Sequence, residues 1–195
     1  IYLTGNPQIT FFKVVYRRHT NFSMESIQQT WNGTPDGAAG SRCTSTISRN
    51  GDLVHKMYIQ VESPDTLAKA NGGSDWISTA TLEIGGQQID KITGQWMEVW
   101  SELTEPNPTG AALNASATGT LFQNMTGFGG TAISSKVNAS FAFVPLPFWF
   151  CRNPGLALPL IALQYHEVKL VLEHGLTTSY NANAKQVLYV DYIYL

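Results

Sequence analysis

The stretch that decides the fold is PLPFWFCRNPGLALPLIALQYHEVKLVLE, which occupies Pro145–Glu173. It holds three consecutive aromatic residues near its start, continues as an apolar run bracketed by proline and glycine, and ends in a segment where apolar and charged residues alternate. Alternation with Val168, Leu170 and Leu172 on one side predicts a strand with one buried face. We expect protein to cover most of the apolar run, and the order of parts is that of a chain crossing between two sheets. No active-site motif lies in this stretch, so the pattern informs us about packing and not about catalysis.

The composition favours one large domain with few charges. The chain has 195 residues, of which 43% are hydrophobic and 13% are charged. Soluble domains usually carry about 25% charged residues, so we expect part of this surface to be buried against other subunits. The net charge of −2 gives no electrostatic reason to bind nucleic acid or an anionic membrane.

Alternating patterns predict further strands along the chain. The predicted strands are Ile9–Arg18, Phe22–Trp31, Cys43–Ile47, Val54–Val61, Trp76–Ile84, Gln87–Ile92, Phe141–Val144 and Val187–Leu195. The pair Gly85-Gly86 predicts a hairpin turn.

One segment breaks the strand pattern and predicts a short helix over residues 95–103. Trp96, Val99, Trp100 and Leu103 recur at the spacing of one helical face, and the two prolines that follow end the helix. We expect its apolar face to close an end of the sheets.

These elements predict an all-β fold, an eight-stranded jelly-roll sandwich with one short helix and long loops. The longest predicted loop is Thr104–Lys136, which is rich in Gly, Ala, Ser, Thr and Asn. An immunoglobulin-like sandwich fits less well, because its Cys-Trp-Cys core spacing is absent. The chain begins at Ile1 and ends in the strand-like VLYVDYIYL, and we expect both ends to be cuts through a longer polypeptide.

No constellation of residues predicts catalysis, a metal site or a cofactor. His166-Glu167 lacks the second histidine of HExxH, and the glycine-rich run at 127–130 lacks the Lys-Ser/Thr ending of a phosphate loop. No GxSxG elbow is present, and the carboxylates are scattered. Cys43 and Cys151 belong to no cluster, so we expect two free thiols.

Two sets of residues are candidates for other roles. Asn32, Asn114 and Asn124 head Asn-x-Ser/Thr sequons and are candidate glycosylation sites. Phe148, Trp149, Phe150, Trp96 and Trp100 are candidates for the core or for contacts between subunits, and the sequence does not separate these alternatives.

Long blocks of the sequence carry a resemblance to a known family. The blocks are NPQITFFKVVYRRHTNF (6–22), GGQQIDKITGQWMEVWSEL (85–103), LPFWFCRNPGLALPLIALQYHEVKL (146–170) and VDYIYL (190–195). In content and order they resemble the N-terminal region of major capsid proteins of nucleocytoplasmic large double-stranded DNA viruses. They cover both ends and the middle of the chain.

The resemblance implies a structural role in a virus particle. Family members carry two tandem jelly rolls, and residues 1–195 would be the first. Three chains would form a pseudo-hexagonal capsomer of an icosahedral capsid, in contact with neighbouring capsomers and minor capsid proteins. The shell would surround an internal viral membrane without inserting into it or contacting nucleic acid directly. Assembly would take place in the cytoplasm of the infected host cell.

A carbohydrate-binding jelly-roll module is the alternative from another functional class. Five tryptophans and several asparagines motivate it, because lectin sites expose an aromatic ring beside acids and amides. We expect most of the tryptophans to lie in the core, which counts against this alternative. An enzyme is the weakest hypothesis.

Overall fold

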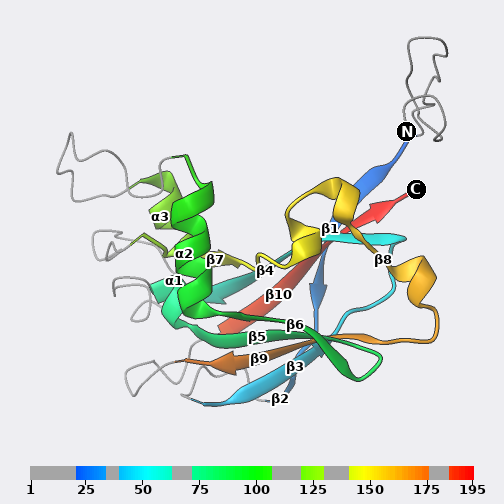
Figure 1. Cartoon of the computed structure of the whole chain (residues 1–195), viewed down its shortest axis with the longest axis horizontal. Helices are drawn as coiled ribbons and strands as arrows, with labels where there is room; N and C mark the ends of the chain where they lie inside the picture. Colours follow the sequence, from blue (N-terminus) through cyan, green and yellow to red (C-terminus); the bar gives the residue numbers. More distant parts are fainter. Residues whose placement is uncertain (1–20, 34–39, 63–71, 107–119, 130–140, 176–184) are drawn as a thin grey trace, which may run out of the picture.

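The protein is a sandwich of two antiparallel sheets (Figure 1). The computed structural model describes residues 21–33, 40–62, 72–106, 120–129, 141–175 and 185–195. The predicted strand Ile9–Arg18, the sequon at Asn114 and most of the predicted loop Thr104–Lys136 lie outside these residues.

Each sheet contains five strands of the described chain. The first sheet has the order β1 (Ser23–Gln29), β10 (Lys185–Tyr194), β4 (Leu53–Glu62) and β7 (Phe141–Pro145), and β8 (Leu158–Pro159) also pairs with β4. The second sheet has the order β2 (Asn32–Gly33), β3 (Arg42–Thr46), β9 (Val168–His174), β5 (Ile77–Ile84) and β6 (Gln87–Thr93).

The connectivity is that of a jelly roll. Apart from the β5–β6 hairpin, the long strands of the described chain alternate between the sheets, and the first of them, β1, lies beside the last, β10. In β10, Leu188 lies opposite Gln29 on one side and Ile59 on the other. Eight strands of the described chain have five or more residues, so the predicted jelly-roll class is confirmed.

Glycine makes the predicted hairpin between β5 and β6. Gly85 and Gly86 both have positive φ, at 61° and 81°, which a two-residue turn of this kind requires. The hairpin prediction is therefore confirmed, with β6 ending one residue later than expected.

The stretch 145–173 crosses between the sheets as predicted, since β7 belongs to the first sheet and β9 to the second. Three 3-10 turns lie between them: η1 (Trp149–Cys151), η2 (Pro154–Leu156) and η3 (Leu160–Leu163). The expectation that protein covers most of the run is wrong in its second half, where Leu156, Ile161 and Tyr165 are 53%, 62% and 93% exposed. Short turns on the outside of the sandwich have no layer above them.

The described residues contain three α-helices, so the prediction of one short helix is wrong. They are α1 (Gly72–Asp75), α2 (Gly94–Thr104) and α3 (Leu121–Thr126). The sequence pattern predicted α2 only. In α3, a capping box joins Thr120 and Gln123, and Gly127 closes the helix in the left-handed region. These caps were visible in the sequence, but six residues are too few for an apolar period to appear.

A buried polar network joins the two sheets. Gln186 Oε1, on β10, accepts hydrogen bonds from Trp76 Nε1 (2.8 Å) and His174 Nε2 (2.9 Å). Trp Nε1 can only donate, which fixes the amide orientation. His174 Nδ1 lies within hydrogen-bonding distance of both Ser41 Oγ (2.8 Å) and Ser41 O (3.1 Å). The Gln186 amide nitrogen donates to Cys43 Sγ (3.0 Å). Gln186 lies in the first sheet, whereas His174 and Cys43 lie in the second.

Replacing the centre of this network tests its contribution to stability. Gln186→Leu removes the acceptor that Trp76 Nε1 and His174 Nε2 share, and each lost buried hydrogen bond costs about 1–3 kcal/mol. We expect the free energy of unfolding, measured by denaturant titration of the full-length protein, to fall by about 3 kcal/mol. Gln88→Leu, at an exposed position of β6, is the matched control and should change it by less than about 0.5 kcal/mol. Equal effects of the two substitutions would contradict a bridging role.

Candidate subunit interface

The inward side of α2 carries one glycine, one methionine and one serine. Gly94, Met97 and Ser101 are its buried residues. A Cβ on Gly94 would lie 2.2 Å from Ser74 O and 2.3 Å from Ile77 O, so only glycine permits this close approach. The Thr93 hydroxyl caps the helix by accepting from Trp96 N at 3.1 Å. The glycine contact and the cap together fix which side of α2 faces the sheets.

The apolar side of α2 faces outward. Trp96, Val99 and Leu103 are 40%, 50% and 73% exposed, and we call these three residues the outer stripe. The predicted helix is confirmed, but the expected inward orientation is wrong for these three residues. Trp100, the fourth residue of the predicted face, is half-buried and lines a pocket beside the first sheet. The periodicity correctly grouped these residues on one face, and the glycine contact turned the opposite face toward the sheets.

Hydrogen bonds tie α2 and α3 to one loop residue, Gly129. Gly129 N donates to Glu98 Oε1 of α2 (2.6 Å), and Gly129 O accepts from Gln123 Nε2 of α3 (2.9 Å). Gly73 N of α1 donates to Gly127 O, just beyond α3 (3.2 Å). The three helices therefore form one cluster beside the sheets (Figure 1). On α3, Leu121 and Met125 are also exposed.

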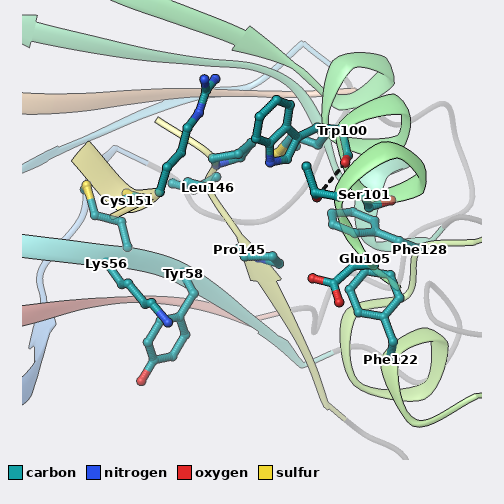
Figure 2. A pocket seen from close by; sticks show the side chains of 15 residues that line it. Lys56, Tyr58, Trp100, Ser101, Glu105, Phe122, Phe128, Pro145, Leu146 and Cys151 are labelled. Atoms are coloured by element: carbon teal, nitrogen blue, oxygen red, sulfur yellow. Dashed lines mark hydrogen bonds between the residues drawn. The ribbon is translucent and has the colours of Figure 1, made fainter. Parts of the chain in front are cut away.

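A pocket of about 240 Å³ lies between this helix cluster and the first sheet (Figure 2). Its apolar lining comes from α2, α3, β4 and the β7–η1 segment: Met57, Met97, Trp100, Phe122, Phe128 and Leu146. Its charged residues are Lys56, Glu105 and Arg152, and the Arg152 guanidinium lies 4.1 Å from the centre of the Trp100 ring. Such a pocket suits an apolar side chain and offers no nucleophile with a base.

Cysteine and carboxylate chemistry gives no sign of catalysis here. Cys43 and Cys151 form no disulfide, as predicted. Burial raises the pKa of the Cys151 thiol to about 12, so the nucleophilic thiolate is scarce at neutral pH. Within the described ranges, no group of three His, Cys, Asp or Glu side chains could hold a metal ion.

The structure places the five candidate packing aromatics in three different surroundings. Phe148 and Phe150 are fully buried and stack at 5.8 Å between ring centres, so they belong to the core. Trp149 is half-buried and meets Phe150 edge-on at 5.1 Å. Trp96 and Trp100 lie together on α2, with ring centres 5.9 Å apart.

The candidate glycosylation residues differ in accessibility. Asn32 is exposed in the two-residue strand β2. Asn124 is half-buried within α3, and the hydroxyl of its sequon partner Thr126 donates to Phe122 O at 2.8 Å.

The surroundings of the tryptophans do not resemble a sugar site. Trp76 is buried, and the exposed Trp96 lies beside the Trp100 ring and shares its helix face with Val99 and Leu103. Among the helices of the described segments, none has the length and apolar character to cross a membrane.

Comparison with known proteins gives one consistent result. The family model for the N-terminus of major capsid proteins matches residues 10–195. The major capsid protein of Pyramimonas orientalis virus is 50% identical over 204 residues, covering 100% of this chain and 50% of that protein. The major capsid protein of Phaeocystis pouchetii virus is 41% identical over 241 residues, covering 100% of this chain and 46% of that protein.

Solved structures agree with the sequence relatives. A quasi-atomic model of the PBCV-1 virus capsid matches with a TM-score of 0.69 and 34% identity, over 95% of this chain and 45% of that chain. The chain thus spans about half the length of the relatives it matches.

The raised pKa of Cys151 makes a measurable prediction. We expect alkylation of Cys151 by iodoacetamide at pH 8 to be on the order of a thousandfold slower than that of an ordinary thiol. The rate should rise about tenfold per pH unit up to pH 10, because the thiolate fraction grows in that proportion below the pKa. Peptide mapping by mass spectrometry measures the rate, with denatured protein as the control. A rate that levels off below pH 10 would contradict the raised pKa.

Proposed function

Because the chain belongs to the major capsid protein family of large DNA viruses, we propose that it is the N-terminal jelly roll of a structural capsid subunit without catalytic activity. The match of residues 10–195 to the family's N-terminal model carries this proposal. The jelly-roll connectivity and the lack of a catalytic constellation among the described residues support it.

The whole subunit would be a double jelly roll that assembles as a trimer. The relatives are about twice as long as this chain, which leaves room for a second domain of similar size. Three such chains would give a capsomer with six domains and a pseudo-hexagonal outline. The low charge and the apolar outer stripe support burial of this surface against protein.

The remaining partners follow from a place in an icosahedral shell. Capsomers would contact one another and minor capsid proteins, and the shell would lie close to an internal viral membrane without inserting into it. The weakly negative net charge supports the absence of direct nucleic-acid contact. Assembly would take place in the cytoplasm of the infected host cell, and the mature location is the virion capsid.

Light scattering of the full-length protein tests the trimer. We expect a mass three times that of one chain at micromolar concentration, because the proposed capsomer is an obligate trimer and obligate interfaces bury large apolar surfaces. Electron microscopy of the source particle should show pseudo-hexagonal capsomers on an icosahedral lattice. A protein that stays monomeric at this concentration would overturn the assembly proposed here.

Glycosylation makes a second prediction. We propose that Asn32 is an acceptor and that Asn124 is not, because Asn32 is exposed and Asn124 is half-buried in a capped helix. Glycopeptide mapping of protein from virions should find a glycan on Asn32, and Asn32→Gln should remove its mass. A glycan on Asn124 with none on Asn32 would reverse this assignment.

A further inference from the structure

Three apolar side chains of the crossing from β7 to β9 are open to solvent at one end of the sandwich. Leu156, Ile161 and Tyr165 are 53%, 62% and 93% exposed, and we call these three residues the η3 patch. In Figure 1 the orange segment that follows β8 holds most of this patch and lies on the right, at the end opposite to the helix cluster. Exposed apolar side chains that gather in this way mark a surface that other protein covers.

Hydrogen bonds tie the patch to the other connections at this end. Arg49, between β3 and β4, donates to the carbonyls of Leu163 and His166. Gly85 N, in the turn between β5 and β6, donates to Glu167 O at 2.9 Å. The segment that carries the patch is therefore already ordered, and an ordered surface loses little conformational entropy when another segment packs on it.

The last strand leaves the domain beside the patch. Leu195 N, directly after β10, donates to Asp52 Oδ2 (2.8 Å), and Asp52 O accepts from Leu160 N (2.9 Å). Leu160 directly precedes Ile161 of the patch. One residue therefore holds both the end of β10 and the start of η3, so polypeptide that continues from Leu195 starts next to the η3 patch.

The exit point itself also exposes apolar side chains. Leu195 is 74% exposed, and Phe22, which comes just before β1, is 64% exposed. Ser23 lies opposite Tyr194 in the pairing of β1 with β10, which places Phe22 and Leu195 at the same end of the first sheet. Apolar side chains thus face solvent both at the exit point and on the patch.

The proposed assembly indicates which part of the subunit is at hand to cover them. The relatives are about twice as long as this chain, and the proposed second jelly roll follows residue 195. In a ring of six domains from three such chains, threefold symmetry makes first and second jelly rolls alternate. The neighbours of a first jelly roll are then second jelly rolls, and the sequence that starts nearest to the patch is the one that joins the two domains.

We propose that the segment after Leu195 that joins the two jelly rolls, which we call the link, packs apolar side chains on the η3 patch. The link thereby fixes the second jelly roll relative to the first. A segment that starts beside its docking surface has a high effective concentration there, so a small contact area holds it. This inference rests on the proposed double jelly roll and names the surface of the first domain that the link uses.

Photo-crosslinking of the full-length protein identifies what covers the patch. The photoreactive residue p-benzoylphenylalanine replaces Tyr165, which is aromatic and almost fully exposed, so the fold is little disturbed. Val99, a 50% exposed residue of α2 at the other end of the sandwich, takes the same replacement as the matched control. We expect position 165 to crosslink within its own chain to residues that directly follow Leu195, as peptide mass spectrometry identifies them. Position 99 should give no such crosslink.

Limited proteolysis of the full-length protein measures how firmly the link is held. Ile161→Ser removes an apolar side chain from the patch, and we expect cleavage in the link to become about tenfold faster, because cleavage follows the population of the released segment. Val99→Ser is the matched control and should change the rate by less than about twofold. Circular dichroism checks folding, and Tyr165→Ser takes the place of an Ile161→Ser variant that does not fold.

Other results overturn the proposal. A crosslink from position 165 to a second copy or to residues 1–20 means that a different segment covers the patch. The absence of any crosslink, or equal cleavage rates for Ile161→Ser and Val99→Ser, means that the link does not dock there. A full-length protein that is monomeric in light scattering refutes the proposed trimer, and the crosslink within one chain is still measured in that monomer, so the two failures are distinct.

Discussion

The hydrogen-bond network around Gln186 is the constraint on which the rest of the structure depends. It joins β10 of one sheet to β9 and β3 of the other through side chains that are buried and paired. Buried polar groups tolerate few arrangements, so such a network fixes the relative position of the sheets more narrowly than apolar contacts do. Trp76, which the network holds, directly follows α1, and α1 is the surface against which Gly94 places α2. The Gln186 side chain therefore helps to position α1, and through α1 it helps to orient the outer stripe of α2.

The sequence predicted the strands well because each strand has one buried face. In β4, Met57, Ile59 and Val61 are buried while their neighbours are not, which is the signal that alternation carries. The crossing from β7 to β9 was predictable for the same reason. The Gln186 network was not predictable, because its members are 12 to 143 residues apart and nothing local marks a glutamine in an apolar strand as a bridge.

The candidate interface was only half predictable. Helical spacing shows which residues share a face, but it does not show whether that face meets the core or a neighbour. Gly94 decided the matter for α2, and its role depends on carbonyl groups that the chain brings close only after folding. The sequence also did not show which aromatic residues of the run 148–150 are buried. Phe148 and Phe150 fill the core, and Trp149 lies at its margin.

The two sheets differ in the side-chain contacts that they make away from the core. On the first sheet, Tyr58 stacks on Tyr189 at 5.4 Å and meets Phe143 at 6.2 Å. On the second, Arg42 lies 4.0 Å from Glu83, and Thr79 donates to Glu173 at 3.3 Å. Both sheets carry charged side chains, such as Lys56 and Asp191 on the first, but a chain with so few charges cannot cover every face with polar groups. Apolar side chains then remain on α2, on η3 and over the first sheet, and these surfaces can be shielded from water only by other protein.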